Sequence, residues 1–200
     1  MFPRRRVEPL VKALAVRLYH QGLSLRRVCE VLGELGDGWR FSYEALRRWY
    51  LKAGMLLPRG RRRRRAIALD ETVVKVVGAK NWLWSAVDAY SEEPLASYLS
   101  PQRSFVHTTL FLERVLERCE NKPLVYTDNG PWYPWALELY GLRHRREASG
   151  RRNTVERWFN AIKARTKRFY NNFPFHSTLE SVARWIDPFT ALHSMGRGLS

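Results

Sequence analysis

The organisation of this chain is decided at residues 66–77, which read Ala-Ile-Ala-Leu-Asp-Glu-Thr-Val-Val-Lys-Val-Val. Four apolar residues, an acidic pair and a run rich in β-branched residues predict one long strand. Upstream of this stretch the apolar residues recur at helical spacing, and downstream the pattern becomes one of strands alternating with helices. The sequence therefore predicts a change of structure at residue 66.

Downstream of this strand we expect a turn at residues 78–81 and an antiparallel meander. Helices are predicted to begin at Ser104 and Ser177, with Pro188 bending or ending the last one. Three antiparallel strands followed by alternating helices and strands imply an α/β fold, a mixed sheet flanked by helices. The further strands are predicted at residues 82–89, 94–99, 124–127 and 142–146, and the further helices at residues 131–140 and 153–170.

Upstream, residues 7–53 predict three short helices, the second and third capped by Ser24 and Ser42 and the first ended by Gly22. A basic outer face on the third helix suits a DNA major groove, so a helix-turn-helix module is favoured, although many helical hairpins have the same pattern. The inward residues are expected to be Val11, Leu14, Ala15 and Leu18, then Leu25, Val28, Cys29 and Leu32, then Tyr43, Leu46 and Tyr50. The outward basic residues of the third helix are expected to be Arg47, Arg48 and Lys52.

Between these parts, Pro58 and Gly60 break regular structure before five consecutive arginines. Dense like charges repel, so we predict an extended, solvated linker whose arginines contact DNA phosphates. These arginines are Arg61, Arg62, Arg63, Arg64 and Arg65. The predicted organisation is a small all-α helix-turn-helix domain at 1–56, a basic linker at 57–65 and an α/β domain at 66–200.

Charge is the first indication of function. The chain carries 35 Lys and Arg against 19 Asp and Glu, a formal net charge of +16. Such an excess favours a nucleic-acid partner, although a generically basic protein would also carry it. We expect no membrane span, no signal peptide and a cytoplasmic location, nucleoid-associated when DNA is bound. Cys29 and Cys119 are expected to be small buried residues without a disulfide.

Three acidic residues stand where a shared site would form. Asp70 lies in the long strand, Asp128 follows the apolar strand at 124–127, and Glu156 lies in the first turn of the helix at 153–170. Sites in sheets flanked by helices gather at strand ends. Each residue also has a local interpretation: a solvated pair for Asp70-Glu71, a turn for Asp128-Asn129-Gly130, and a capping box for residues 153–156.

Three clustered carboxylates suit metal-dependent attack on a phosphodiester. Two hard cations about 4 Å apart can activate the attacking oxygen and stabilise the leaving oxygen. Magnesium prefers oxygen ligands and is commonly held by carboxylates together with substrate phosphate. Without cations, carboxylates at that distance would repel by roughly 4 kcal/mol per pair at an effective dielectric of 20. The cluster therefore favours bound cations.

Four segments carry a family resemblance: Leu-Asp-Glu-Thr at 69–72, Trp-Ser-Ala-Val-Asp at 84–88, Tyr-Thr-Asp-Asn-Gly at 126–130 and Asn-Thr-Val-Glu-Arg at 153–157. Residues 66–193 resemble the DDE transposases of bacterial and archaeal insertion sequences, most nearly insertion-sequence family six. These enzymes have a ribonuclease-H-like fold shared with retroviral integrases, and a preceding helix-turn-helix is usual among them. The motifs are specific as a set and weak one by one.

The resemblance implies that Asp70, Asp128 and Glu156 hold Mg²⁺, with Mn²⁺ able to substitute. It also implies a basic residue seven positions after the glutamate, which Lys163 supplies. Glu156, Asn160, Lys163 and Lys167 share one helical face, so both lysines are candidate contacts to a substrate phosphate. The spacing from Asp128 to Glu156 is shorter than usual for the family, which leaves Glu147 as the fallback ligand.

The function implied by the resemblance is transposition. The protein would bind the terminal inverted repeats of its element as a homodimer, cut a strand and direct the freed 3′-OH at target DNA. Two other classes stay open: a DNA-binding protein without catalysis that descends from a transposase, and a structural RNA-binding protein. The intact acidic trio favours the enzyme.

Overall fold

The computed structural model describes residues 7–57, 60–128, 130–147, 150–166, 172–173 and 177–197. The chain divides into two compact units, Met1–Leu57 and Pro58–Ser200. In the described part of the chain, no helix combines the length and the apolar character that crossing a membrane requires.

The N-terminal unit is helical, with α1 (Pro9–His20), α2 (Leu25–Leu35), the short 3₁₀ helix η1 (Asp37–Trp39) and α3 (Tyr43–Leu56). Ser24 and Ser42 cap α2 and α3 as predicted, because each hydroxyl accepts a hydrogen bond from a backbone N–H three residues on. Gly22 follows α1 with a φ of 115°, a conformation that favours glycine. The core of the unit is formed by Val11, Ala15, Val16, Tyr19, Val28, Leu32, Leu46 and Tyr50.

Two residues predicted to lie inward in this unit do not. Tyr43 and Leu14 are 51% and 38% exposed. Tyr43 opens α3, and the inward face of that helix begins one turn later at Leu46. Tyr19 and Tyr50 are buried in this unit and pair edge-on, with ring centroids 4.8 Å apart. Cys29 is half-buried and Cys119 is buried, and both are free thiols.

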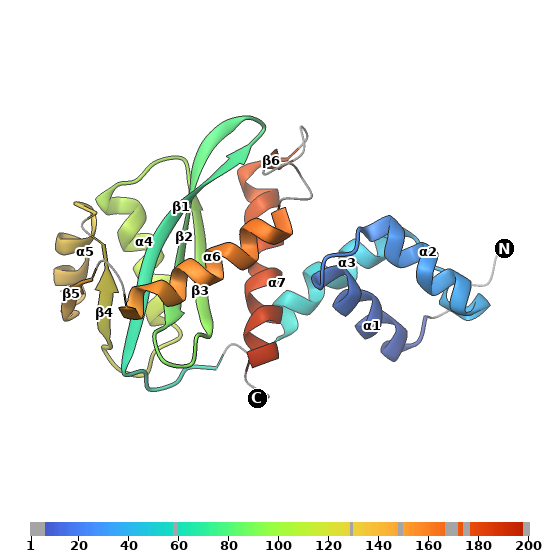
Figure 1. The fold of residues 1–200 in the computed structure, drawn as a ribbon, viewed down its shortest axis with the longest axis horizontal. Helices are drawn as coiled ribbons and strands as arrows, with labels where there is room; N and C mark the ends of the chain where they lie inside the picture. The colour runs from blue at the N-terminus through green and yellow to red at the C-terminus, as the bar shows by residue number, and fades with distance from the viewer. Residues whose placement is uncertain are drawn as a thin grey trace. The chain divides into compact units, whose positions relative to one another are not determined.

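The C-terminal unit is built on a six-stranded mixed sheet in the order β3-β2-β1-β4-β5, with β6 pairing the far end of β1 (Figure 1). β1, β2 and β3 form the predicted antiparallel meander, while β4 and β5 run parallel to β1. The strands are β1 (Ala66–Val76), β2 (Ala79–Asp88), β3 (Pro94–Ser100), β4 (Leu124–Thr127), β5 (His144–Arg146) and β6 (Asn172–Phe173). The helices are α4 (Phe105–Leu116), α5 (Tyr133–Leu139), α6 (Asn153–Thr166) and α7 (Leu179–Arg197), and a 3₁₀ turn, η2 (Gly150–Arg152), precedes α6.

Helices cover both faces of the sheet, and the alternation along β1 assigns its residues to them. Ala66 and Ala68 pack in the cluster formed by α6 and α7, whereas Ile67 and Leu69 pack in the cluster formed by α4 and α5. The expected α/β fold class, a mixed sheet flanked by helices, is therefore confirmed. It places Asp70 on the α6 side of the sheet and Glu71 on the α5 side.

Two details of the C-terminal unit differ from expectation. β6 was not predicted, because two residues carry no periodic signal. Pro188 does not end the last helix: α7 continues to Arg197. Ile186 and Phe189, on either side of the proline, are both buried against the sheet, and this packing holds the helix together across it.

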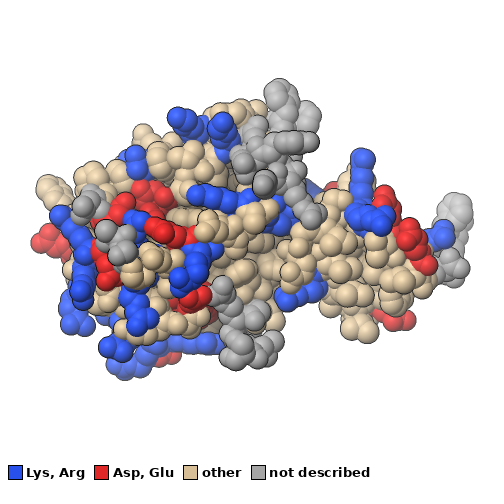
Figure 2. Space-filling model, viewed as in Figure 1, with Lys and Arg blue, Asp and Glu red and all other residues tan. Residues whose placement is uncertain are grey.

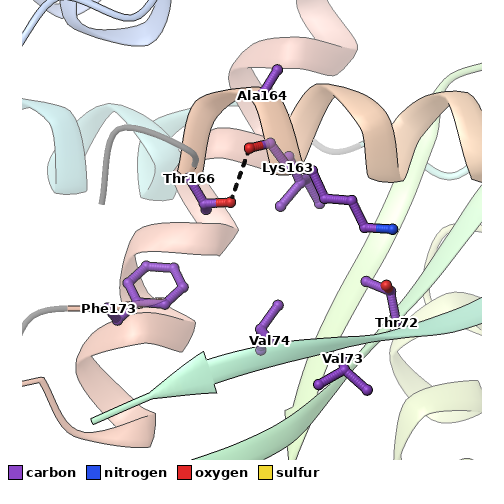
Figure 3. A pocket seen from close by; sticks show the side chains of 8 residues that line it. Thr72, Val73, Val74, Lys163, Ala164, Thr166 and Phe173 are labelled. Carbon is purple, nitrogen blue, oxygen red and sulfur yellow. Dashed lines mark hydrogen bonds between the residues drawn. The ribbon is translucent and has the colours of Figure 1, made fainter. Parts of the chain in front are cut away.

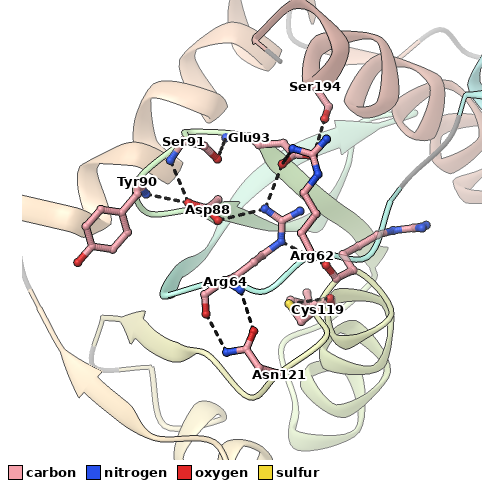
Figure 4. Close-up of polar contacts among 11 residues, drawn as sticks. Arg62, Arg64, Asp88, Tyr90, Ser91, Glu93, Cys119, Asn121 and Ser194 are labelled. Atoms are coloured by element: carbon pink, nitrogen blue, oxygen red, sulfur yellow. Dashed lines mark hydrogen bonds and ion pairs between the residues drawn. The ribbon is translucent and has the colours of Figure 1, made fainter. Parts of the chain in front are cut away.

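The arginine run also departs from the prediction of a solvated linker. Arg64 is 5% exposed, and its Nη1 lies 3.0 Å from both Asp88 Oδ2 and Glu93 Oε2 (Figure 4). Asn121 Oδ1 accepts a hydrogen bond from the Arg64 backbone N–H at 2.7 Å, and Arg62 forms a β-bridge with Cys119. Two carboxylates compensate the buried charge, so the segment is fastened to the unit at Arg64, while the other four arginines of the run are exposed.

Candidate active site

The register of two parallel strands sets the level of the two aspartates. β1 and β4 pair Ala66 with Leu124 and Ala68 with Tyr126. Continuing the same offset brings Asp128, which follows β4, level with Asp70 in β1. Asp70 lies on the face that α6 covers, and Glu156 lies in the first turn of α6. Strand pairing and helix packing thus bring together three acidic residues that are far apart in the sequence.

The three carboxylates converge on one guanidinium, that of Arg152. Its Nη1 lies 3.8 Å from Asp70 Oδ2 and 3.9 Å from Asp128 Oδ2. Its Nη2 donates a hydrogen bond to Glu156 Oε1 at 2.5 Å. Because Arg152 Nη1 is common to both distances, Asp70 Oδ2 and Asp128 Oδ2 lie no further apart than the sum of 3.8 Å and 3.9 Å. Acidic and basic side chains gather near β4 and β5 on the visible face (Figure 2).

Each aspartate has one oxygen held by the backbone and the other facing Arg152. Asp70 Oδ1 accepts a hydrogen bond from the Glu71 backbone N–H at 2.8 Å, and Asp128 Oδ1 accepts one from the Gly130 N–H at 2.8 Å. The second contact is the turn that the Asp-Asn-Gly sequence indicates. The turn and the shared cluster are therefore compatible, since they use different oxygens of Asp128.

Burial dominates the electrostatics of Asp70. Removal from water raises the pKa of this carboxyl to about 6, against the lowering effect of Arg152 and of the Glu71 N–H. The neighbouring charges of Asp128 and Glu156 contribute a smaller part of this rise in the pKa. A carboxyl in this position is costly to ionise without a nearby cation.

Glu71 is not the solvated neighbour that one interpretation of the acidic pair suggested. Its side chain is 3% exposed, on the opposite face of the sheet from Asp70. It accepts hydrogen bonds from the Tyr133 hydroxyl at 2.6 Å and from Arg103 at 3.3 Å, and burial raises its pKa. Arg103 in turn lies 3.7 Å from the ring centroid of Trp82 and 4.2 Å from that of Trp132. This structural cluster was not predicted.

The donor set fits hard divalent cations, although the carboxylates are not arranged around a metal. Throughout the described residues, no three Asp, Glu, His or Cys side chains are placed to hold one ion. The acidic trio nevertheless offers only oxygen donors, which Mg²⁺ and Mn²⁺ accept, and it already surrounds a positive group. Asp70, Asp128 and Glu156 are therefore the candidate metal ligands.

Sequence reasoning missed Arg152, and its fallback ligand, Glu147, lies beside the residue that precedes Asp128, because the Glu147 backbone N–H donates to the Thr127 carbonyl at 3.0 Å. Arg152 precedes Glu156 by four residues, a spacing that permits an ion pair between them but does not reveal the contacts with Asp70 and Asp128. Glu147 Oε2 accepts a hydrogen bond from the Arg151 backbone N–H at 3.0 Å, at the start of the η2 turn. That contact does not involve the trio or Arg152.

Lys163 lies on the expected face of α6. Its side chain is exposed, like those of Glu156 and Asn160, and Lys167 lies outside the described residues. It extends over β1 beside a cavity of about 380 Å³ (Figure 3). Thr72, which lines that cavity with Lys163, lies two residues from Asp70 on the same face of β1. The lining residues are Thr72, Val73, Val74, Ile162, Lys163, Ala164, Thr166 and Phe173.

The candidate DNA-binding residues differ in exposure. Arg47, Arg48 and Lys52 are exposed on α3, opposite buried Leu46 and Tyr50. In the arginine run, Arg61, Arg62, Arg63 and Arg65 are exposed. Arg64 is the exception, and its nomination as a phosphate contact is wrong, because Asp88 and Glu93 hold its guanidinium inside the unit.

Comparison with known proteins identifies relatives along the whole chain. A family model described as a DDE domain matches residues 64–198. An uncharacterized protein of Methanocaldococcus jannaschii is 39% identical over 201 residues, which cover 100% of this chain and 92% of that protein. An uncharacterized protein of Aquifex aeolicus is 45% identical over 56 residues, which cover 28% of this chain and 46% of that protein.

Two solved structures illustrate the likeness to integrase cores. The catalytic core domain of BIV integrase aligns with a TM-score of 0.49 and 18% identity, over 64% of this chain and 82% of that chain. The HTLV-2 integrase catalytic core domain in complex with magnesium aligns with a TM-score of 0.48 and 19% identity, over 67% of this chain and 86% of that chain.

Proposed function

Because the chain belongs to the DDE-domain transposases, we propose that it cuts and joins DNA strands at a site formed by Asp70, Asp128 and Glu156. One observation carries this proposal: three acidic side chains from three separate elements converge on a single cationic group. Three carboxylates exceed the single positive charge of Arg152, and divalent cations would compensate the excess of acidic groups. The substrate is double-stranded DNA, with the terminal inverted repeats of a mobile element and a target duplex as its two forms.

The three carboxylates are proposed to hold two Mg²⁺ ions, for which Mn²⁺ can substitute. When bound, the ions supply an activated oxygen nucleophile and stabilise the leaving oxygen. The backbone N–H groups of Glu71 and Gly130 fix one oxygen of each aspartate and leave the other free to bind. Lys163 is proposed to hold a phosphate of the strand near the carboxylates as a point charge.

The N-terminal unit is proposed to be the helix-turn-helix domain that binds the terminal repeats. α3 buries Leu46 and Tyr50 and exposes Arg47, Arg48 and Lys52, a division of faces that suits docking in a major groove. Transposition requires two element ends to be held together, so we propose a homodimer as the active form.

Nicking of supercoiled plasmid DNA in Mg²⁺ tests the catalytic proposal. Wild-type protein should nick, and Asp70→Asn should not. Glu138→Gln is the matched control, because it removes an exposed carboxylate of α5 outside the trio and should keep activity. Nicking by Asp70→Asn at the wild-type rate would reject the site. Joining of a labelled duplex with a free 3′-OH to the plasmid tests strand transfer in the same way.

Occupation of the carboxylates by Arg152 favours one alternative, a DNA-binding protein without catalysis. An arginine that neutralises the trio permanently would leave a stable fold with no place for metal. Calorimetric titration with Mn²⁺ separates the two functions, because only the enzyme should bind the ion at its carboxylates.

A further inference from the structure

Arg152 is the positive charge of the acidic trio. Its side chain is 16% exposed and reaches all three carboxylates, but neither aspartate contact is shorter than 3.8 Å. Its Nε is buried and makes no hydrogen bond in the structure. A guanidinium has five N–H donors in a rigid fork, and a buried donor without a partner carries a desolvation cost. The carboxylates therefore hold Arg152 by charge, with incomplete hydrogen bonding.

Neighbouring arginines have partners of their own. Arg151 donates to the Ala89 carbonyl at 3.3 Å and stacks on Tyr90, with 4.2 Å between guanidinium and ring centroid. Arg157 pairs with Glu92. Of Arg151, Arg152 and Arg157, only Arg152 is thus directed at the acidic trio.

A guanidinium and divalent cations placed between the same carboxylates repel each other and compete for the same space. The oxygens that face Arg152 are Asp70 Oδ2, Asp128 Oδ2 and Glu156 Oε1, and on the proposed function these also face the ions. Metal binding must therefore displace Arg152, whose side chain remains tethered four residues before Glu156. Its planar fork matches two oxygens of a phosphate, and a DNA strand at the carboxylates brings phosphates within its reach.

We propose that Arg152 neutralises the metal-free site, and that metal loading releases its guanidinium to bind a backbone phosphate of the DNA. The inference rests on the proposed function, since it requires metal at the trio. It adds a DNA contact that exists only in the loaded protein. The Arg152 side chain thereby couples metal binding at the carboxylates to the affinity for DNA.

The first test is the affinity for metal without DNA. Calorimetric titration of the full chain with Mn²⁺ alone compares wild type, Arg152→Gln and the control Arg157→Gln. Arg152→Gln removes the competing cation, so its affinity should rise about five- to tenfold, the equivalent of one partly buried ion pair. Arg157→Gln should resemble wild type. Unchanged or weaker binding by Arg152→Gln would overturn the proposal, because a residue that only positions Glu156 predicts a loss.

The second test is the salt dependence of DNA binding, measured in EDTA and in Ca²⁺. Each phosphate contact contributes about −0.9 to the slope of log affinity against log salt concentration. In Ca²⁺ the wild-type slope should be steeper than that of Arg152→Gln by about this amount, and in EDTA the two should agree. Equal slopes in both conditions would overturn the release step.

Two provisions keep the outcomes distinct. If Arg152→Gln does not fold without metal, Arg152→Lys replaces it, since a lysine keeps the charge but cannot span three carboxylates, and its Mn²⁺ affinity should still exceed that of wild type. If wild type itself binds no Mn²⁺, the proposed function fails. If wild type binds Mn²⁺ and neither variant binds it more tightly, only the role of Arg152 fails.

Discussion

Gly130 and Trp132 leave no room for a methyl group between them. A Cβ on Gly130 would lie 2.8 Å from Cε2 of the Trp132 indole. The indole cannot turn away cheaply, because Arg103 stacks on it at 4.2 Å and Trp84 meets it edge-on at 6.3 Å. The same glycine donates the backbone hydrogen bond that orients Asp128.

Gly130→Ala should therefore weaken metal binding. Displacement of the turn moves Asp128 away from the other two carboxylates, so we expect the affinity for Mn²⁺ to fall at least about tenfold. The overpacking should also lower the free energy of unfolding by about 1 to 3 kcal/mol. Calorimetry and denaturant titration measure the two effects. Gly60→Ala is the control, since a Cβ there meets no atom within 4 Å. Wild-type affinity in Gly130→Ala would show that the turn does not set the position of Asp128.

Asp70→Asn should stabilise the metal-free protein at pH 7 by about 2 to 3 kcal/mol, because it removes a buried charge whose pKa is raised to about 6. Denaturant titration in EDTA measures this gain. Mg²⁺ should then raise the melting temperature of wild type but not of the variant. A large loss of metal-free stability would instead assign Asp70 a structural role.

The gain from Asp70→Asn should depend on pH with a definite sign. As pH falls from about 6 to about 4, native Asp70 takes up a proton and the unfolded chain does not, so the free energy of unfolding of wild type rises in this window. The asparagine side chain of the variant cannot titrate in this way, and the difference between the two proteins should vanish near pH 4. A difference that stays constant from pH 7 to pH 4 would contradict the raised pKa.

Arg64→Gln should destabilise the C-terminal unit by about 3 kcal/mol at pH 7, because it leaves Asp88 and Glu93 without their buried cation. Arg63→Gln, which changes the exposed neighbour in the same run, should cost less than about 0.5 kcal/mol. Denaturant titration of the two variants makes the comparison. Equal effects would mean that the arginines are interchangeable.

Acid should remove the advantage of Arg64. Burial alone would raise the pKa of Asp88, but the backbone N–H groups of Ser91 and Tyr90 and the Arg64 guanidinium outweigh it and hold that pKa below its ordinary value. Stability from such a group is present above the ordinary carboxyl pKa of about 4 and is lost as pH falls through the lowered value. The difference between wild type and Arg64→Gln should shrink in that acidic range.

Basic residues of α3 should contribute to DNA affinity through phosphates or bases. Lys52→Gln is expected to reduce the salt slope of binding by about 0.9 if it removes one phosphate contact. Arg47→Gln and Arg48→Gln extend the test along the same face. Arg27→Gln on α2, which pairs with Glu30, is the matched control and should leave the slope unchanged. If only Arg27→Gln lost DNA binding, the DNA-contacting surface would be assigned to α2 and not to α3.

The local signals in the sequence predicted most of the fold. β4 begins and ends where Pro123 and Asp128 indicated, and Ser104 caps α4 as expected, because each of these signals acts on its own backbone neighbours. The prediction that Tyr43 lies inward was wrong, because helical periodicity identifies the apolar face of a helix but not the turn at which that face becomes buried.

The candidate site was predictable only in part. The positions of Asp70, Asp128 and Glu156 on their elements followed from the pattern, but the identity of their counter-ion did not. Arg152 stands among several arginines of similar sequence context, and convergence of three elements decides which of them faces the acids. Arg64 shows the same limit, since Asp88 and Glu93 select it from a run of identical side chains.

The offset between β1 and β4, which brings Asp128 level with Asp70 when it is continued past the paired residues, makes the site tolerant of some length changes and intolerant of others. β2, β3 and α4 lie between the two residues along the chain, yet their length does not enter the offset between β1 and β4. Insertions in the connecting loops can thus accumulate in relatives without moving either carboxylate. One residue added within β4 would shift its end by about 3.3 Å and turn its side chains to the opposite face.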